Sequence, residues 1–349
     1  MPHVTIISST FRPGGIDIFL AGMRDQSYKD FEVILVDHRY ERRRDRVRQL
    51  AKDYGVPLIH VPEHRRNGKW NVFISAWNTG IALARGDVLI LLQDWTYAPR
   101  GWIEAHLSAL DGKRRYVLAP YIYGQVPPLV TKIPFDFSKQ MDRGGYCVDI
   151  DPILNGEVLD EIFAFQNGPF EYHWFLGMAA ALATDQDVRV SPRGPLSTGC
   201  WSWIHVKNES ITRKLMWELN GLDERLERGK GPMDLDLGIR LVGAGVELWW
   251  EPSAITYGPN ARYVCRSMPW GSMHERLGGR WSYDDGLTYN ERRRREIDAG
   301  GSPRALNSYD MQDLASLLDW WRTPDADPRS RDVSDEEYWN CKEIWPDTP

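Results

Sequence analysis

The chain has 349 residues, of which 42% are hydrophobic, so it is long enough to build one large domain or two smaller ones around a sizeable core. Its formal net charge of −6 provides no global positive field, which argues against a chain drawn as a whole to nucleic acid or to an anionic membrane. The four cysteines are widely spaced and form no CxxC pair, which excludes a small disulfide framework and favours a reducing, cytoplasmic setting.

Alternating strand and helix patterns run through the first 120 residues. Apolar runs rich in β-branched residues and leucine alternate with stretches whose apolar residues recur at helical spacing. Strands are predicted at Val4–Ser8, Phe31–Val36, Pro57–Val61 and Val88–Gln93, and helices near Asp17–Asp25, Arg42–Tyr54 and Asn71–Arg85. This rhythm predicts an α/β fold with a Rossmann-like, mostly parallel sheet flanked by helices.

The pattern weakens between residues 121 and 195, where prolines and glycines break the chain into short pieces. Within this region, Trp174–Ala183 predicts a helix. Further elements are predicted as helices at Ser210–Leu219 and Asp234–Ala244, a strand at Val246–Trp250, and an amphipathic helix around Met311–Trp321 in a charged tail. We therefore expect a second half with an irregular insertion and a C-terminal helical tail.

The apolar run Val88–Leu92 is followed closely by an acidic residue, Asp94. In open α/β sheets, ligands bind outside the carboxyl ends of the strands, so Asp94 is expected to point into a substrate crevice. A carboxylate at such a place indicates a metal or catalytic site. The alternative is that Asp94 only caps a turn, because Pro99 and Gly101 break the chain soon afterwards.

Four segments, taken in chain order, resemble the family 2 glycosyltransferases, which have the GT-A fold. They read VTIISSTFRP, DQSYKDFEVILVDHR, AWNTGIALARGDVLILLQDWTYAPRGW and NGLDERLERGKGPMDLDLGIRLVGAGVELWWEPSA, and they lie within residues 1–110 and 196–257. The resemblance implies three parts: a nucleotide-sugar-binding α/β half at 1–120, an acceptor-binding half with the irregular insertion at 121–282, and a charged C-terminal extension at 283–349.

Six residues are expected to bind the donor. Thr10 and Phe11 match the family's nucleotide loop, and Asp37 matches the acid that accepts a hydrogen bond from the uracil N–H. Lys69, just before a helix, is placed to approach the diphosphate as a point charge. The other two donor-binding candidates are Asn78 of the Asn-x-Gly-Ile helix and Gln93 at the strand end. The alternatives are an ordinary polar strand end for Asp37 and a solvated loop lysine for Lys69.

The resemblance also implies a divalent cation, Mn²⁺ or Mg²⁺, held by Asp94. Carboxylate oxygens suit such an ion, which stabilises the negative charge that builds on a departing nucleoside diphosphate. Gln93 and Trp95 replace the family's flanking acids, so substrate phosphates must supply more of the ligands. His274, in WGSMHER, is a candidate further metal ligand, and a lone surface histidine is the alternative.

The general base is expected at Asp234. Inverting transfer requires a group that takes the proton of the acceptor hydroxyl as its oxygen attacks the anomeric carbon. Asp234 falls on the family's catalytic aspartate, while Met233 replaces the glutamate beside it. Asp234 also follows Gly231-Pro232 at a helix start, where an N-cap is the alternative and a compatible role.

Together these residues predict an inverting, hexosyltransferase-type glycosyltransferase. It is expected to move a sugar from a nucleotide sugar, UDP-linked, to a saccharide or other hydroxyl acceptor. The first residues lack a signal-peptide pattern and no window approaches about 20 apolar residues, so we expect a cytoplasmic protein without a membrane span.

Two alternatives stay open at this point. One is a nucleotide-sugar-binding protein that has lost catalysis, because the acidic motifs are eroded. The other is a transferase whose acceptor is modified nucleic acid, held by the arginine-rich runs at 39–48 and 292–295. The second is not favoured, because the first run is interleaved with Glu41 and Asp45, which is typical of a solvated helix face.

Overall fold

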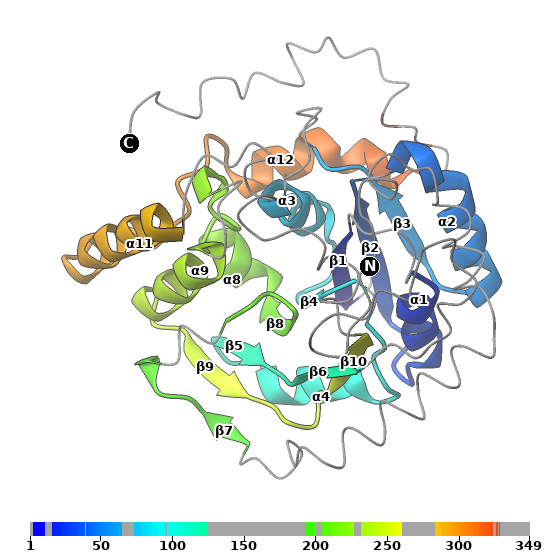
Figure 1. The fold of residues 1–349 in the computed structure, drawn as a ribbon, viewed down its shortest axis with the longest axis horizontal. Helices are drawn as coiled ribbons and strands as arrows, with labels where there is room; N and C mark the ends of the chain where they lie inside the picture. The colour runs from blue at the N-terminus through cyan, green and yellow to red at the C-terminus, as the bar shows by residue number, and fades with distance from the viewer. Residues whose placement is uncertain are drawn as a thin grey trace, which may run out of the picture.

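The computed structural model describes residues 3–10, 16–38, 40–64, 73–94, 96–124, 193–199, 204–226, 232–259, 283–323, 326 and 328. At its centre lies an eight-stranded sheet with helices on both faces (Figure 1). The predicted fold class, a Rossmann-like α/β sheet flanked by helices, is therefore confirmed.

The strands of the central sheet lie in the order β3-β2-β1-β4-β8-β5-β9-β7. They are β1 (Val4–Thr10), β2 (Phe31–Asp37), β3 (Leu58–Val61), β4 (Val88–Leu92), β5 (Arg115–Leu118), β7 (Gly194–Pro195), β8 (Asn208–Thr212) and β9 (Glu247–Trp250). β8 is antiparallel to both of its neighbours and β7 is antiparallel to β9, whereas the other pairs are parallel. The parallel strands therefore all end at one edge of the sheet, where β8 begins, and we call it the carboxyl edge. A separate pair joins β6 (Tyr121–Gly124) to β10 (Thr256–Pro259).

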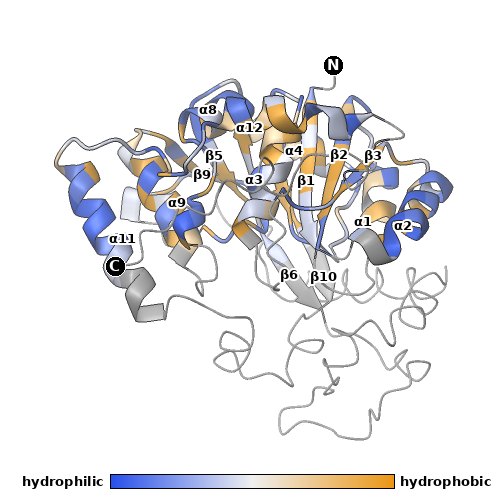
Figure 2. Cartoon of the chain, turned by 90° about the horizontal axis from the view of Figure 1, so that it is seen from above, coloured by the Kyte–Doolittle hydropathy of each residue, from blue (hydrophilic) through white to orange (hydrophobic). Residues whose placement is uncertain are grey.

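Two hydrophobic clusters fill the two faces of the central sheet. The helices in the first cluster are α1 (Ile16–Asp25), α2 (Tyr40–Tyr54) and α4 (Trp102–Leu110). The helices in the second cluster are α3 (Phe73–Leu83), α8 (Arg213–Glu218), α9 (Pro232–Gly243) and α12 (Met311–Leu318). Figure 2 shows hydrophobic strands between helices that carry hydrophilic residues. The sheet is thus the middle layer of three.

All seven elements predicted for the first 93 residues exist, and each end lies within two residues of its prediction. The strong periodicity of the apolar residues explains this agreement. The packing of these elements also depends on glycine at one position. Gly80 lets α3 approach β1 closely, because a Cβ atom at this position would collide with the side chain of Ile7. α4 and β5, which follow, are not predicted.

The predicted helix Ser210–Leu219 is wrong in its first part. Residues 208–212 form β8, and α8 begins at Arg213. Ile211 pairs with Leu89 on β4 and with Tyr116 on β5, so the backbone of β8 is bonded on both sides. This pairing outweighs the local helical pattern, because tertiary context overrides a weak intrinsic propensity.

The predicted amphipathic helix near the C-terminus is confirmed as α12. A 3-10 turn, η6 (Asp319–Arg322), follows it directly. The buried side chains of these two elements belong to the same cluster as α3, and they are Met311, Leu314, Leu318 and Trp321. The helical tail is therefore part of the core on this face of the sheet.

Two other helical regions differ in how they relate to the sequence pattern. α11 (Tyr283–Asp298) packs against α9, although the sequence pattern predicts no helix there. The predicted helix Trp174–Ala183 lies outside the described residues. In the part of the chain that the structure describes, no helix combines the length and the apolar character needed to cross a bilayer.

Candidate active site

Three of the predicted site residues meet at the carboxyl edge. Thr10 and Asp37 are the last residues of β1 and β2, and they are paired in register. Asp94 follows the end of β4, the other neighbour of β1. The Thr10 hydroxyl donates a hydrogen bond to Asp94 Oδ2 at 2.8 Å, and the Asp94 side chain is nearly fully buried. The chain thus brings a residue of the predicted nucleotide loop into contact with the predicted metal ligand.

Asp37 is fully buried and is bound by two basic side chains. Arg43 donates to both carboxylate oxygens at 2.7 Å, and His60 Nε2 lies 2.9 Å from Oδ2. Burial alone would raise the pKa of Asp37, but the Arg43 charge and the His60 hydrogen bond outweigh it and lower the pKa below its ordinary value. These three contacts use most of the roughly four acceptor sites of a carboxylate, so recognition of a base N–H by Asp37 stays a prediction.

Arg43 is a residue of this edge that sequence reasoning misses. It belongs to the basic run at 39–48, and the prediction of a solvated face is wrong for this member, which is almost fully buried. Its Nη2 also lies 3.4 Å from the Thr10 hydroxyl, which joins it to the Thr10–Asp94 pair. The signal in the sequence is the helical spacing of Tyr40, Arg43, Val47 and Leu50, which places one arginine on the apolar stripe of the helix. The structure buries all four side chains.

Asp234 lies in the first turn of α9. α9 leads through Gly245 into β9, which is parallel to β5, so the start of α9 lies toward the carboxyl edge. The helix begins at Pro232, which places Asp234 inside the first turn and not at the N-cap. Burial, followed by the nearby Glu209, raises the pKa of Asp234 to about 8. A carboxyl group that takes up a proton near neutral pH has the property needed of a general base.

Asn78 acts as a clamp inside the fold. Its fully buried side chain accepts a hydrogen bond from Leu222 N at 2.8 Å and donates to Leu222 O at 2.9 Å and to Glu224 Oε1 at 3.0 Å. These bonds join α3 to the segment at 221–226 that includes the 3-10 turn η4 (Glu224–Leu226). Both ends of the amide are used within the protein, which is the physical reason to assign Asn78 to the framework and not to the donor site.

Oxygen ligands for a cation are few at the carboxyl edge. Among the described residues, no three His, Cys, Asp or Glu side chains gather into a metal-binding group. Asp94 offers one carboxylate, and the adjacent Gln93 has a buried Oε1 without a hydrogen-bond partner in the described part of the chain. Hard oxygen donors suit Mg²⁺ or Mn²⁺, and Mg²⁺ usually takes its remaining ligands from water and substrate phosphates. These residues therefore fit an ion that is bound together with a diphosphate.

Three predicted site residues, Phe11, Lys69 and His274, lie outside the residues that the structure describes. Their assignments to the nucleotide loop, the diphosphate and the metal stay predictions.

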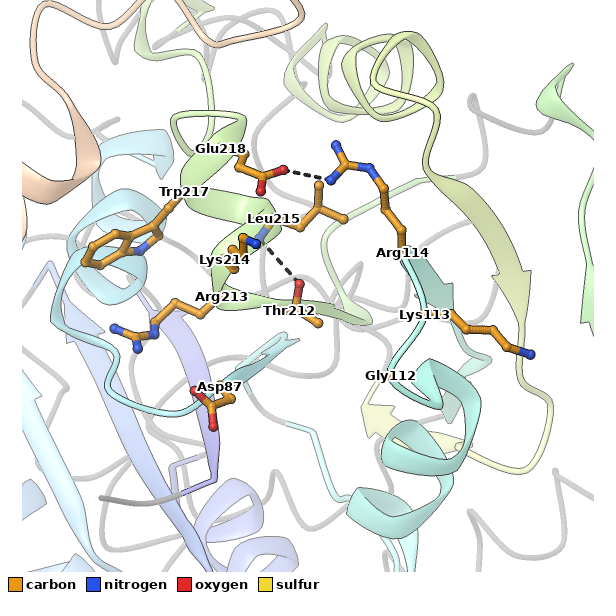
Figure 3. A pocket seen from close by; sticks show the side chains of 10 residues that line it. All are labelled: Asp87, Gly112, Lys113, Arg114, Thr212, Arg213, Lys214, Leu215, Trp217 and Glu218. Carbon is orange, nitrogen blue, oxygen red and sulfur yellow. Dashed lines mark hydrogen bonds and ion pairs between the residues drawn. The ribbon is translucent and has the colours of Figure 1, made fainter.

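A cavity of about 660 Å³ lies at the opposite edge of the sheet (Figure 3). Its lining includes Asp87, just before β4, and Arg213, the first residue of α8. Figure 3 shows Arg114 pointing toward Glu218, and the two side chains form an ion pair at 2.7 Å. None of the predicted site residues lines this cavity, so the candidate active site is the carboxyl edge.

The chain is similar to known proteins in both sequence and structure. Residues 5–166 match the family model described as Glycosyl transferase family 2. A crystal structure of S. aureus TarS, residues 1–349, is similar with 11% identity, covering 85% of this chain and 70% of that chain, at a TM-score of 0.47. Another crystal structure of S. aureus TarS has 11% identity and a TM-score of 0.45, and the match covers 84% of this chain but 43% of that chain. The mannosyltransferase PcManGT from Pyrobaculum calidifontis, in complex with GDP-Man and Mn²⁺, has 15% identity, coverage of 92% of this chain and 87% of that chain, and a TM-score of 0.43. No curated protein sequence matches the chain significantly.

Proposed function

We propose that the protein, whose residues 5–166 match the family model described as Glycosyl transferase family 2, is an inverting, metal-assisted glycosyltransferase whose donor is a nucleotide sugar, UDP-linked. The observation that carries the proposal is the convergence of site residues at the carboxyl edge. Thr10 and Asp37 end β1 and β2, Asp94 follows the end of the adjacent parallel strand β4, and Asp234 lies in the first turn of α9. Ligands of open α/β sheets bind at this edge.

On the donor side, the proposal uses Asp94 with Gln93 as its neighbouring oxygen. A divalent cation bound there would offset the negative charge that develops on the leaving nucleoside diphosphate. The Thr10 hydroxyl donates to Asp94 and thereby fixes the direction of its carboxylate. Phe11 and Lys69 are proposed to hold the nucleotide base and the diphosphate, as the sequence predicts.

On the acceptor side, the proposal assigns the proton transfer to Asp234. The acceptor hydroxyl oxygen forms a bond to the anomeric carbon, the bond from this carbon to the diphosphate oxygen breaks, and the hydroxyl proton passes to Asp234. A pKa of about 8 favours this transfer, because a basic carboxylate accepts the proton more readily than one with its ordinary pKa. Burial of the Asp234 Oδ1 atom also limits competition from water.

The proposal is tested with Asp94→Asn and Asp234→Asn. UDP- and GDP-sugars are screened for donor hydrolysis with and without Mn²⁺, and transfer is then measured with the donor that reacts fastest. Each variant is expected to lose activity by about 100-fold or more, because each removes a charge used in the transition state. Asp319→Asn is the matched control, since that side chain is 63% exposed on η6. Full transfer activity in both site variants would refute the assignment.

Calorimetry separates an active enzyme from a binding protein that has lost catalysis. The parent protein is titrated with UDP in the presence and absence of Mn²⁺. A metal-dependent gain in UDP affinity that Asp94→Asn abolishes is the expected result. UDP binding that ignores Mn²⁺, combined with no hydrolysis of any donor, would favour the degenerate protein.

A further inference from the structure

Glu209 is a buried carboxylate in the middle of the central sheet. It lies on β8, opposite Leu91 of β4 and Leu118 of β5. Three donors hold it: the Tyr116 hydroxyl at 2.5 Å, the backbone N–H of Val206 at 2.8 Å and that of His205 at 2.9 Å. A carboxylate is costly to bury, and burial raises the pKa of Glu209 to about 7, although its three hydrogen bonds and the nearby positive charge of Lys207 offset part of the cost.

The segment that Glu209 holds is a strained turn. Val206 has a φ of 48°, a left-handed conformation that is unfavourable for a β-branched residue. The Val206 N–H points to Glu209 in this conformation, so the hydrogen bond helps to keep the strained backbone in place. The next carbonyl group, that of Lys207, accepts a hydrogen bond from Gln93 N at 2.8 Å. Through residues 205–207, Glu209 therefore fixes the chain directly against the strand end that leads to Asp94.

Glu209 also faces the helix that carries Asp234. Leu91 and Leu118, its neighbours in register, belong to the same hydrophobic cluster as Met233 of α9. Two charged groups act on Asp234 there: Glu209 from β8 raises its pKa, and Lys207 from the turn lowers it. Asp234 has a buried Oδ1 without a hydrogen-bond partner among the described residues. The turn and its carboxylate thus lie between the two halves of the candidate active site.

We propose that Glu209 is a positioning residue for the transfer reaction, which fixes the turn at 205–207 between Asp94 and Asp234 and places a second carboxyl group beside the base. The catalytic part of this inference rests on the proposed function, and the fixing of the turn does not. The negative charge of Glu209 strengthens the affinity of Asp234 for a proton. Burial raises the pKa of Glu209, and the hydrogen bond that Tyr116 donates from β5 acts against this and favours the charged form.

The central experiment compares Glu209→Gln with the parent and with Glu218→Gln, whose side chain is a partly exposed member of a surface ion pair on α8. The Asp234 carboxyl is titrated by carbon NMR, with Asp234→Asn identifying its signal. In Glu209→Gln its midpoint is expected to fall from about 8 by roughly one pH unit or more, because a neighbouring negative charge is removed. The acid limb of kcat/KM is expected to move in the same direction, with kcat about tenfold lower and the donor KM changed less than twofold.

Hydrogen exchange at Val206 and Lys207 measures the turn independently of catalysis. Faster exchange at these amides in Glu209→Gln, and not in Glu218→Gln, is the expected result. If Glu209→Gln does not fold, Tyr116→Phe provides the test, since it removes one of the three donors and should cause smaller changes in the same directions. An unchanged Asp234 midpoint or unchanged exchange at the turn would overturn the role of Glu209. Retained transfer in Asp234→Asn would instead refute the assignment of the base, so the two failures are distinguishable.

Discussion

At the scale of single residues, the buried Asp37 and the partly buried Asp234 have opposite tendencies to ionise. Asp37 has a guanidinium in direct contact, and its pKa is lowered despite burial. Burial and the nearby Glu209 raise the pKa of Asp234 to about 8, and the charge of Lys207 offsets this only in part. Environments that separate the pKa values of two acids in this way are typical of sites that use one as a fixed charge and the other as a proton acceptor.

The raised pKa of Asp234 predicts a pH-dependent stability. Its folded-state pKa of about 8 exceeds the ordinary value of 3.8, so this group favours the folded state fully below pH 3.8, and that contribution is lost as the pH rises through 8. The substitution Asp234→Asn removes this pH-dependent loss of stability, because asparagine does not ionise. The free energy of unfolding of this variant, measured relative to the parent by urea denaturation, is expected to rise between about pH 5 and pH 9, by on the order of 1 kcal/mol or more.

Asp319→Asn is the control for this measurement, because its exposed carboxyl group should give no such change. A stability difference between Asp234→Asn and the parent that stays constant over the same pH range would show that Asp234 ionises normally.

Residue types at strand ends allowed much of the site to be predicted. Thr10, Asp37 and Asp94 could be placed at one edge because parallel strands end together. Asn78 could not be placed, since its partners on the segment at 221–226 are more than 140 residues away in sequence. The role of Glu209 is hidden for the same reason, because its environment is made by β5, α9 and a strained turn.

At the scale of secondary-structure elements, α2 shows how a basic helix can serve a buried site. Arg43 lies on the inward stripe of α2, and its pair with Asp37 joins the helix to the end of β2. Other basic residues of the helix, such as Lys52, face solvent. The charged residues of one helix therefore have different roles, and their helical spacing decides which of them is buried.

Arg43→Met is predicted to destabilise the fold by about 3–5 kcal/mol, because it leaves the Asp37 charge buried without its partner. Urea denaturation near neutral pH provides the measurement. The lowered pKa of Asp37 means that its contribution to stability is present above its ordinary pKa of 3.8 and is lost as the pH falls below it. The difference between variant and parent should therefore shrink in acid.

Two further variants make this prediction specific. Lys52→Met, on the exposed side of α2, should change the stability by less than about 0.5 kcal/mol. Arg43→Met combined with Asp37→Asn should be more stable than Arg43→Met alone, because the unpaired charge is gone. Equal stabilities of the single and double variants would show that the ion pair does not couple α2 to β2.

Elements with strong local periodicity were predicted well, and those that depend on distant partners were not. β1 to β4 and α1 to α3 have apolar patterns that identify them without their neighbours. β8 reads locally as the start of a helix, because Ser210 and Ile211 precede a helical stretch. Its strand conformation is set by β4 and β5, whose sequences lie about 90 to 120 residues earlier.

At the scale of the whole molecule, the C-terminal elements are structural members of the core. α12 packs on α3, and Leu318 is completely buried beside residues from the first part of the chain. Arg322 of η6 also donates a hydrogen bond to the backbone carbonyl of Leu83, at the end of α3. The predicted extension at 283–349 thus contains residues that pack on α3 and stabilise the first part of the chain.

Leu318→Ala is expected to lower the free energy of unfolding by about 2–5 kcal/mol, because it opens a cavity in a packed cluster. Leu317→Ala is the matched control at the preceding position of the same helix, where the side chain is 42% exposed, and it should change the stability by less than about 0.5 kcal/mol. Thermal and urea unfolding measure both. Similar effects of the two substitutions would mean that α12 does not pack as described.

The position of β8 has a consequence for the chain during its synthesis. β5 pairs only with β8 and β9 in the described sheet, and β4 also has β8 as its outer neighbour. After β5 has been made, about 90 residues must follow before β8 exists. At about 5–20 residues per second this interval is roughly 5 to 20 seconds, during which apolar strands have open edges that can pair with other chains. Protection of the nascent first half by a chaperone is therefore expected to matter until β8 is inserted.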